Sequence, residues 1–207
     1  ADYRAVNPLF GTMEDCEAMI AEADALGMGF MFDMVFNHTS WDHEWFRKAL
    51  AGDPEYMDYY IFRDGEPDTP PTEWTASFGT GAWDYAPEVG KWYLHLFAPE
   101  QPDLNWENPK VREELKNVIR FWKDKGVKGF RFDVLNLISK PESLSEPKTG
   151  SAVRFCKDGR HVHEFIRELV TDTGIEDMIT VGEMSSTTLE NCIRYSSPAS
   201  HEMSMCF

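Results

Sequence analysis

Apolar residues recur at two kinds of spacing along this chain, and the two kinds alternate. Three stretches carry apolar residues three or four positions apart, as on one face of a helix, and the first of them ends at Gly27. Three other stretches are almost continuously apolar and have the length of a strand. The predicted helices are residues 13–26, 111–122 and 162–170, and the predicted strands are residues 29–36, 127–135 and 178–181. Strands that are apolar on both faces belong to a parallel sheet covered by helices, so the pattern predicts an α/β fold.

The periodicity disappears between the first predicted strand and the second predicted helix, over residues 39–102. This stretch is rich in aromatic, proline and acidic residues, and it is too long for an ordinary loop between a strand and a helix. Its aromatic residues can build a small core of their own, and they include Trp74, Phe78, Trp83, Tyr85, Trp92, Tyr93 and Phe97. We therefore expect three parts, namely residues 1–38, an inserted subdomain at 39–102, and residues 103–207.

Polar side chains lie at the end of each predicted strand. Asn37 and His38 follow the first strand, Asp133 ends the second, and Glu183 follows the third. Parallel α/β folds place their functional sites at the carboxyl ends of the strands, so these residues are candidates for a common site. Three strand-helix units cannot close an eight-stranded barrel, so the predicted sheet is at most part of one.

Arg131 and Asp133 are two residues apart on one predicted strand, so their side chains project from the same face. An ion pair between them would keep Asp133 charged. Glu183 follows an apolar strand end, where partial desolvation favours a protonated carboxyl group. One charged and one protonated carboxyl group is the division of labour in a retaining glycosidase. From the spacing alone, a structural ion pair is the commoner interpretation.

Four segments of the chain, in this order, resemble the signature regions of the α-amylase superfamily of glycoside hydrolases. They are residues 33–38 (DMVFNH), 101–105 (QPDLN), 129–134 (GFRFDV) and 181–184 (VGEM). The resemblance covers essentially the whole chain. It implies a partial (β/α)8 TIM barrel, from about the third to the fifth strand, with the inserted subdomain after the third strand.

The resemblance also implies roles for the candidate residues. Asp133 is the expected nucleophile and Glu183 the expected general acid/base, while His38 and Arg131 are expected to contact the nucleophile or the glycosyl unit. Asp33 is interpreted as structural. The last signature region of the superfamily supplies a His-Asp pair with a third carboxylate, and nothing after Glu183 matches it. We therefore expect this chain to be a central piece of the enzyme, without meaningful turnover on its own.

Neither a metal nor a cofactor is expected. In calcium-dependent members of the superfamily, Asn37 and Asp103 would correspond to metal ligands, but those members carry Lys-His where residues 136–137 of this chain are Asn-Leu. Asn37 is therefore interpreted as a hydrogen-bonding residue at a strand end. His161 and His163 are two residues apart at a predicted helix start, where their side chains diverge, so capping or surface roles are expected for them.

The substrate class can be narrowed by resemblance within the superfamily. Residues 95–97, 101–106 and 133–140 resemble the oligo-1,6-glucosidase group, and Val134 is similar to members that do not prefer α-1,4 links. Residues 182–188 (GEMSSTT) look most like members that hydrolyse trehalose 6-phosphate to glucose and glucose 6-phosphate. The alternative is an oligo-1,6-glucosidase that acts on isomalto-oligosaccharides. Arg160 and Lys140 are candidates for holding a phosphate.

An alternative from another class is a barrel relative without catalysis, which would act as a binding or transporter-associated domain. Such a chain would lack Asp133 or Glu183, and both are present. The hydrolase is therefore the preferred interpretation.

The resemblance implies one partner, a small carbohydrate substrate that is a disaccharide or a phosphorylated disaccharide, and the composition argues against nucleic acid and membrane. The formal net charge of −16 would repel nucleic acid, and no apolar run reaches the length of about 18 residues that crosses a membrane. The four cysteines are sparse and show no C-x-x-C spacing, so they are expected to be reduced thiols. Reduced thiols fit a cytoplasmic location.

Overall fold

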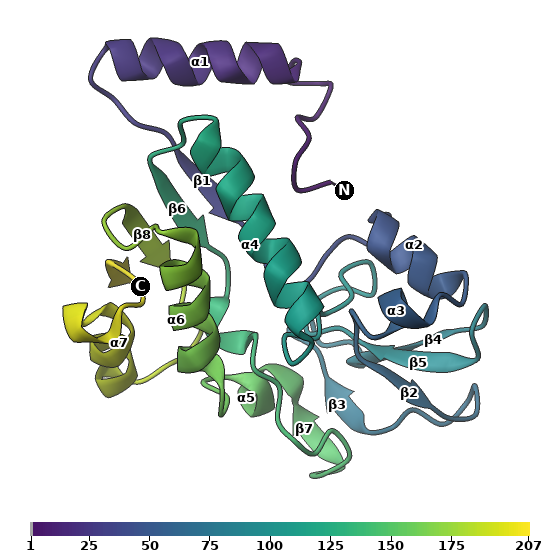
Figure 1. Cartoon of the computed structure of the whole chain (residues 1–207). Coiled ribbons are helices and arrows are strands. Elements are labelled where there is room, and N and C mark those ends of the chain that lie inside the picture. The colour runs from purple at the N-terminus through teal and green to yellow at the C-terminus, as the bar shows by residue number, and fades with distance from the viewer. Residues whose placement is uncertain (1) are drawn as a thin grey trace.

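The computed structural model describes residues 2–207, and a parallel β-sheet lies at its centre (Figure 1). Its strands lie in the order β1, β6, β8 and β9, and each strand runs parallel to its neighbour. Their bounds are Met31–Met34, Gly129–Phe132, Ile179–Gly182 and Met205–Cys206. The parallel sheet confirms the predicted α/β fold.

Two amphipathic helices, α4 (Pro109–Asp124) and α6 (Val162–Thr173), pack on this sheet and on each other. Asn108 caps α4 by accepting a hydrogen bond from the Lys110 backbone N–H, and Pro109 begins the helix where no intrahelical partner is needed. The apolar face of α4 is buried at Val111, Leu115, Val118, Ile119 and Trp122. With Phe130 and Phe132 of β6, these side chains form the main core.

The helix α1 (Met13–Ala25) is capped at its N-terminal end and buries little of its surface. Thr12 and Asp15 form a reciprocal capping box, since each side chain accepts a hydrogen bond from the other residue's backbone N–H. Only Ile20 and Ala23 of this helix are buried, and Figure 1 shows it lying across the ends of β1 and β6. The predicted helix at residues 13–26 is thereby confirmed.

The sequence predicted the elements of the sheet better than their lengths. The predicted helices at 111–122 and 162–170 and the three predicted strands are all present. The second strand is shorter than the predicted range 127–135, because the chain leaves the ladder after Phe132 and forms a 3-10 turn, η1 (Leu135–Leu137). The fourth strand, β9, was not predicted, because two paired residues are too short to show a pattern.

Residues 39–102 form a compact region with a small antiparallel sheet in the order β2, β5 and β4. Its elements are α2 (Glu44–Leu50), α3 (Pro54–Met57), β2 (Phe62–Asp64), β3 (Glu73–Thr75), β4 (Trp83–Ala86) and β5 (Lys91–Leu94). Trp74, Trp83 and Trp92 are buried in a second core as predicted, whereas Tyr93 belongs to the main core and Phe78 is 70% exposed. Phe78 lies in a turn, which leaves its ring in solvent.

A later segment of the chain pairs back onto this region. Strand β7 (Thr149–Ser151) runs parallel to β3, and it leads directly into α5 (Ala152–Cys156). Leu144, Ala152 and Cys156 thereby join the second core, together with the buried tryptophans. The sequence did not predict β7, which is exposed at all three residues and carries no apolar pattern.

The last elements are α7 (Leu189–Ser196) and a 3-10 turn, η2 (Pro198–Ser200), which lead into β9. Tyr195 is the buried residue of α7, and it packs in the main core. Across residues 2–207, no helix combines the length and the apolar character that crossing a membrane requires.

Candidate active site

Strand register brings the candidate carboxylates to one edge of the parallel sheet. Phe132 of β6 is paired with Gly182 of β8, so the next residues, Asp133 and Glu183, leave adjacent strands at the same level. The backbone fixes this level on both sides, because Glu183 N–H donates to the Phe132 carbonyl and Leu135 N–H donates to the Glu183 carbonyl. The two residues predicted at strand ends therefore lie side by side.

Arg131 joins the two carboxylates. Its Nη1 lies 2.6 Å from Asp133 Oδ1, and its Nη2 lies 2.7 Å from Glu183 Oε2. The same Nη1 donates to both oxygens of Asp33, at 2.7 and 2.8 Å, because Asp33 is paired with Arg131 in the register of β1 and β6. One guanidinium thus fixes side chains from three neighbouring strand ends.

The charge of Arg131 is strongly held. Partial burial of the guanidinium lowers its pKa, but the hydrogen bonds and charges of Asp33 and Asp133 outweigh that effect and raise the pKa well above its ordinary value. A permanent cation therefore lies within hydrogen-bond distance of Asp133, the candidate nucleophile. All three side chains remain partly exposed, so a ligand can reach them.

Val134 directs a backbone donor at Glu183. Its N–H lies 3.2 Å from Glu183 Oε2, and its φ of 38° and ψ of 43° place it in the left-handed region. A β-branched residue is rarely found there, and such a conformation stores about 1–3 kcal/mol of strain. Val134 is buried in the second core, which holds it in this conformation. The turn after β6 is therefore shaped around the two carboxylates.

His38 lies at the end of β1, within a hydrogen-bonded frame. The residue is only 6% exposed; its Nε2 faces Gln101 Nε2 at 3.1 Å, and the Tyr3 hydroxyl donates to its carbonyl at 2.9 Å. Its ring also lies 5.4 Å from the ring of Phe97, between centroids. Burial lowers the pKa of the ring, against the opposing charges of Asp103 and Asp133, so the imidazole is neutral at neutral pH.

The buried ammonium group of Lys140 lies next to the segment that carries His38. Lys140 Nζ is 2.7 Å from Asn37 Oδ1 and 2.7 Å from Asp103 Oδ2, and it also donates to the Leu137 carbonyl. Asn37 Nδ2 donates to Asp103 Oδ2 at 3.1 Å, which agrees with its predicted hydrogen-bonding role. An ammonium group with three partners has no donor left for a phosphate, so the interpretation of Lys140 as a phosphate ligand is wrong.

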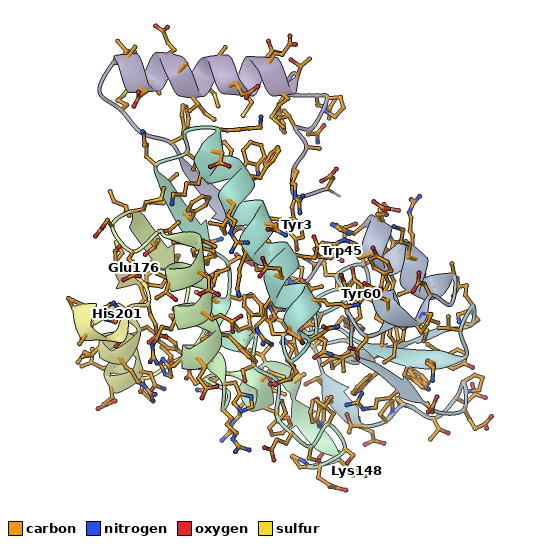
Figure 2. The ribbon with its side chains drawn as sticks, viewed as in Figure 1. Tyr3, Trp45, Tyr60, Lys148, Glu176 and His201 are labelled. Carbon is orange, nitrogen blue, oxygen red and sulfur yellow. The ribbon has the colours of Figure 1, made fainter. Side chains whose placement is uncertain are left out.

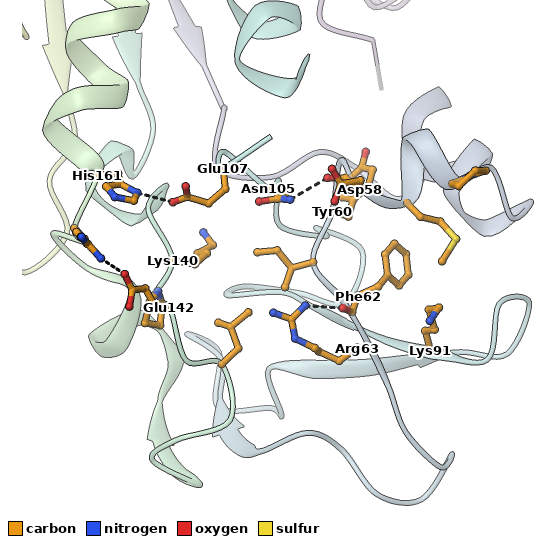
Figure 3. A pocket seen from close by; sticks show the side chains of 16 residues that line it. Asp58, Tyr60, Phe62, Arg63, Lys91, Asn105, Glu107, Lys140, Glu142 and His161 are labelled. Atoms are coloured by element: carbon orange, nitrogen blue, oxygen red, sulfur yellow. Dashed lines mark hydrogen bonds and ion pairs between the residues drawn. The ribbon is translucent and has the colours of Figure 1, made fainter. Parts of the chain in front are cut away.

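Arg160, the other phosphate candidate, lines the same cleft as Lys140. It pairs with Glu142 at this cleft of about 730 Å³, which includes Arg63, Lys91 and His161 and lies between the region of α3 and β2 and the loop after η1 (Figure 3). Neither Asp133 nor Glu183 lines this cleft. Arg160 is therefore not placed beside the candidate carboxylates.

Two of the remaining histidines differ in their surroundings. His163 is not a surface residue, since its Nδ1 lies 2.8 Å from Glu202 Oε1 and its ring stacks on Tyr195 at 4.5 Å between centroids. The surface role expected for it is wrong, because α6 turns this position inward. His201 pairs with Glu176 on the surface, and Figure 2 shows both labelled residues at the edge of the molecule.

The chain matches the family described as alpha amylase, catalytic domain, over residues 1–207. It belongs to this family. It is 50% identical over 208 residues to trehalose-6-phosphate hydrolase of Escherichia coli and 43% identical over 215 residues to oligo-1,6-glucosidase of Parageobacillus thermoglucosidasius. Each alignment covers 100% of this chain and 38% of the relative.

A solved structure gives the same result. The crystal structure of Bacillus licheniformis trehalose-6-phosphate hydrolase matches with a TM-score of 0.91 and 43% sequence identity, over 100% of this chain and 38% of that chain. The chain therefore spans well under half the length of the relatives it matches. The resemblance to the α-amylase superfamily and to its trehalose-6-phosphate hydrolases and oligo-1,6-glucosidases is confirmed.

Proposed function

We propose that the protein containing this chain is a retaining α-glucoside hydrolase, with Asp133 as nucleophile and Glu183 as general acid/base. The observation that carries the proposal is the Arg131 guanidinium, whose Nη1 and Nη2 bind Asp133 and Glu183 respectively. Two carboxyl groups that bind the two terminal nitrogens of one guanidinium lie close together, as the pair in a retaining glycosidase must.

The two carboxyl groups have different surroundings, which supports different roles. Asp133 Oδ1 accepts from Arg131 Nη1, which also binds Asp33, whereas Glu183 Oε2 accepts from Nη2 and from the Val134 N–H. In the first step, an Asp133 oxygen attacks the anomeric carbon while Glu183 protonates the departing glycosidic oxygen. In the second step, Glu183 removes a proton from a water whose oxygen attacks the anomeric carbon and displaces the Asp133 carboxylate, which releases the sugar with net retention.

His38 and Arg131 are the proposed substrate-binding residues. Arg131 holds both carboxyl groups, and the neutral ring of His38 would bind a sugar hydroxyl by exchanging one of its present partners, Gln101 at Nε2 or Asn37 at Nδ1. Replacing His38 by Ala should raise KM and lower kcat/KM, while the unfolding midpoint reports any separate loss of stability.

We further propose that the parallel sheet is part of a (β/α)8 barrel, with β1, β6 and β8 as its third to fifth strands and β9 continuing the sheet. The four parallel strands and the covering helices α4 and α6 support this assignment. Residues 39–102 would be the inserted subdomain between the barrel parts at 1–38 and 103–207. The pair of β3 and β7 ties this subdomain to the later barrel part.

The proposed substrate is trehalose 6-phosphate, which would be split into glucose and glucose 6-phosphate. The support is the 50% identity to trehalose-6-phosphate hydrolase of Escherichia coli, against 43% to an oligo-1,6-glucosidase. In a chain with a net charge of −16, a phosphate binds only where local donors overcome the general repulsion.

We also infer a cytoplasmic location, which the absence of disulfides among the described cysteines supports.

The test compares kcat/KM for trehalose 6-phosphate, trehalose and isomaltose with the full-length protein. We expect the phosphorylated sugar to be preferred, with net retention at the cleaved centre seen by NMR of the first-formed anomer. A clear preference for isomaltose would replace the substrate by an α-1,6-glucoside and leave the two catalytic roles in place. Cleavage of none of the three would contradict both substrates, and inversion would contradict the nucleophile.

A further inference from the structure

One buried side chain connects the two turns that carry the candidate catalytic carboxylates. Asn136 lies in η1, three residues after Asp133, and is fully buried. Its Oδ1 accepts a hydrogen bond from Ser185 N–H at 2.8 Å, and its Nδ2 donates to the Ser185 carbonyl at 3.0 Å. Because Ser185 is two residues after Glu183, this amide pairs the turn after β6 with the turn after β8.

Asp158 holds Asn136 in place from the other side. Its backbone N–H donates to the Asn136 carbonyl at 2.8 Å, and its Oδ1 accepts from Asn136 Nδ2 at 3.1 Å. Burial raises the pKa of this carboxyl group. Hydrogen bonds from Tyr195, Thr187, Asn136 and Asn191 outweigh that effect, so the pKa lies below its ordinary value. Asp158 is thus a charged acceptor, and hydrogen bonds to a charged group are the stronger kind.

The same carboxylate holds the turn after Glu183 and the helix that follows it. Thr187 Oγ1 donates to Asp158 Oδ2 at 2.7 Å, and Asn191 Nδ2 donates to the same oxygen at 3.1 Å. The Tyr195 hydroxyl donates to Oδ1 at 2.7 Å. The Asp158 side chain therefore binds Asn136 in the turn after β6. It also binds three residues of the segment that runs from the turn after β8 into α7, namely Thr187, Asn191 and Tyr195.

The backbone around Asp158 is shaped for this contact. Asp158 has a φ of 52°, in the left-handed region, and the next residue, Gly159, presses on the turn after β6. A Cβ atom added at Gly159 would lie 1.9 Å from the Ser139 carbonyl oxygen, which no side chain can tolerate. A strained, tightly packed turn outside the candidate catalytic residues points to a positional requirement.

We propose that Asn136 and Asp158 are positioning residues that hold Glu183 in register with Asp133 and so set how well Glu183 protonates the departing sugar. This inference rests on the proposed glycosidase function and extends it. Neither residue needs to touch the substrate. Asn136 acts through the Ser185 backbone, and Asp158 acts through Asn136 and Thr187.

Loss of the hydrogen bonds made by Asn136 or Asp158 should slow the hydrolysis of one kind of substrate more than that of another. General acid catalysis contributes about 10²–10⁴-fold, and it matters most for a leaving group that departs poorly without a proton. A sugar alkoxide is such a leaving group, whereas p-nitrophenolate leaves readily without one. A displaced Glu183 should therefore slow hydrolysis of a disaccharide while sparing an aryl glucoside.

The experiment uses the full-length protein and two substrates, p-nitrophenyl α-glucoside and the disaccharide that the wild-type protein cleaves best. For Asn136→Ala, we expect kcat/KM for the disaccharide to fall by about 10–100-fold, the size of loss that about 1 Å of misplacement produces. For the aryl glucoside, we expect a fall below about 3-fold, because that step needs little protonation. The ratio of the two losses is the readout, since a general loss of folded protein lowers both rates equally.

Asn108→Ala is the matched control. Asn108 is also a buried asparagine whose amide binds backbone, at Asp58 and Lys110, but it lies at the start of α4. Its replacement should lower stability and leave the ratio of the two rates unchanged. If Asn136→Ala does not fold, Thr187→Val removes a single hydroxyl bond to Asp158 and should shift the ratio in the same direction by a smaller factor.

The outcomes separate the two proposals. A wild-type protein that cleaves both substrates while the Asn136 and Thr187 variants keep the wild-type ratio would overturn the positioning role alone. Equal losses on both substrates would also overturn it, because they would mark a purely structural residue. A wild-type protein that cleaves no α-glucoside would overturn the glycosidase function, and the positioning role with it.

Discussion

Lys140 Nζ lies 2.7 Å from Asp103 Oδ2, and both side chains are almost completely buried. The pair joins the turn after η1 to a segment that also binds Asn37, next to His38 at the end of β1. Asn37 and Asp103 thus both contact one buried ammonium group of the chain.

Breaking this pair should be costly. Lys140→Met leaves the Asp103 carboxylate buried without its cation, and removing one member of a buried pair costs about 3–5 kcal/mol. The measurement is the free energy of unfolding from urea titrations. Lys128→Met is the control, because Lys128 pairs with Asp24 at the surface at 3.7 Å and should change stability by about 0–1 kcal/mol. Equal effects of the two variants would contradict a structural role for Lys140.

The two catalytic candidates should give different phenotypes. In the full-length protein, Asp133→Asn removes the nucleophile and should abolish the glycosyl-enzyme on every substrate. Glu183→Gln removes the proton donor and should spare the first step for p-nitrophenyl α-glucoside, which needs little protonation, so that the intermediate accumulates. Mass spectrometry of the intact protein detects this intermediate. Equal losses of Glu183→Gln on activated and natural substrates would argue against its role as the acid.

The sequence was informative about the centre of the sheet for a physical reason. Strand-length apolar runs mark β1, β6 and β8, although Asp33 and Arg131 interrupt two of them and β1 and β8 are only partly buried, and the polar residues that follow these strands mark one edge. The structure places Asp133, Glu183 and Arg131 together at that edge. The catalytic roles of Asp133 and Glu183 stay a prediction that the experiments above test.

The sequence could not predict contacts made by residues far apart in the chain. Lys140 and Asp103, like Asn136 and Ser185, meet only because the turns after different strands pack together. From the sequence, a lone Lys or Asn is predicted to lie at the surface, since charged and amide side chains are mostly exposed. The left-handed conformation of Val134 also has no local signal, because valine ordinarily favours an extended backbone.

His43 should make the stability of the protein depend on pH. Its Nδ1 accepts a hydrogen bond from Trp45 N–H at the start of α2, and burial lowers the pKa of the ring from 6.5 to about 4, against a smaller raising effect of Asp2. Between these two values the unfolded chain binds more protons than the folded chain. The contribution is therefore complete above 6.5 and is lost as the pH falls toward about 4.

His43→Asn keeps an acceptor at this helix start but does not titrate. We expect the variant to lose less stability than the wild-type protein when the pH falls from about 7 to about 5, by about 1–2 kcal/mol, because the wild-type histidine must bind a proton on unfolding and its pKa in the folded protein is about 4. The measurement is urea unfolding at both pH values. The same pH slope in both proteins would show that His43 does not hold the helix start through its neutral ring.

Gly159 should tolerate no side chain, although its backbone does not forbid one. An added Cβ atom would meet the Ser139 carbonyl oxygen at 1.9 Å, so Gly159→Ala must push the turn at Asp158 away from the turn after β6. Overpacking of this kind costs about 1–3 kcal/mol. Gly81→Ala is the control, because an added Cβ there has no heavy atom nearer than 3.9 Å, and its effect should stay within about 0.5 kcal/mol. Because the displaced turn carries Asp158, Gly159→Ala should also shift the ratio of disaccharide to aryl glucoside hydrolysis in the direction expected for Asn136→Ala. A loss of stability without any shift of that ratio would mean that Gly159 serves packing alone.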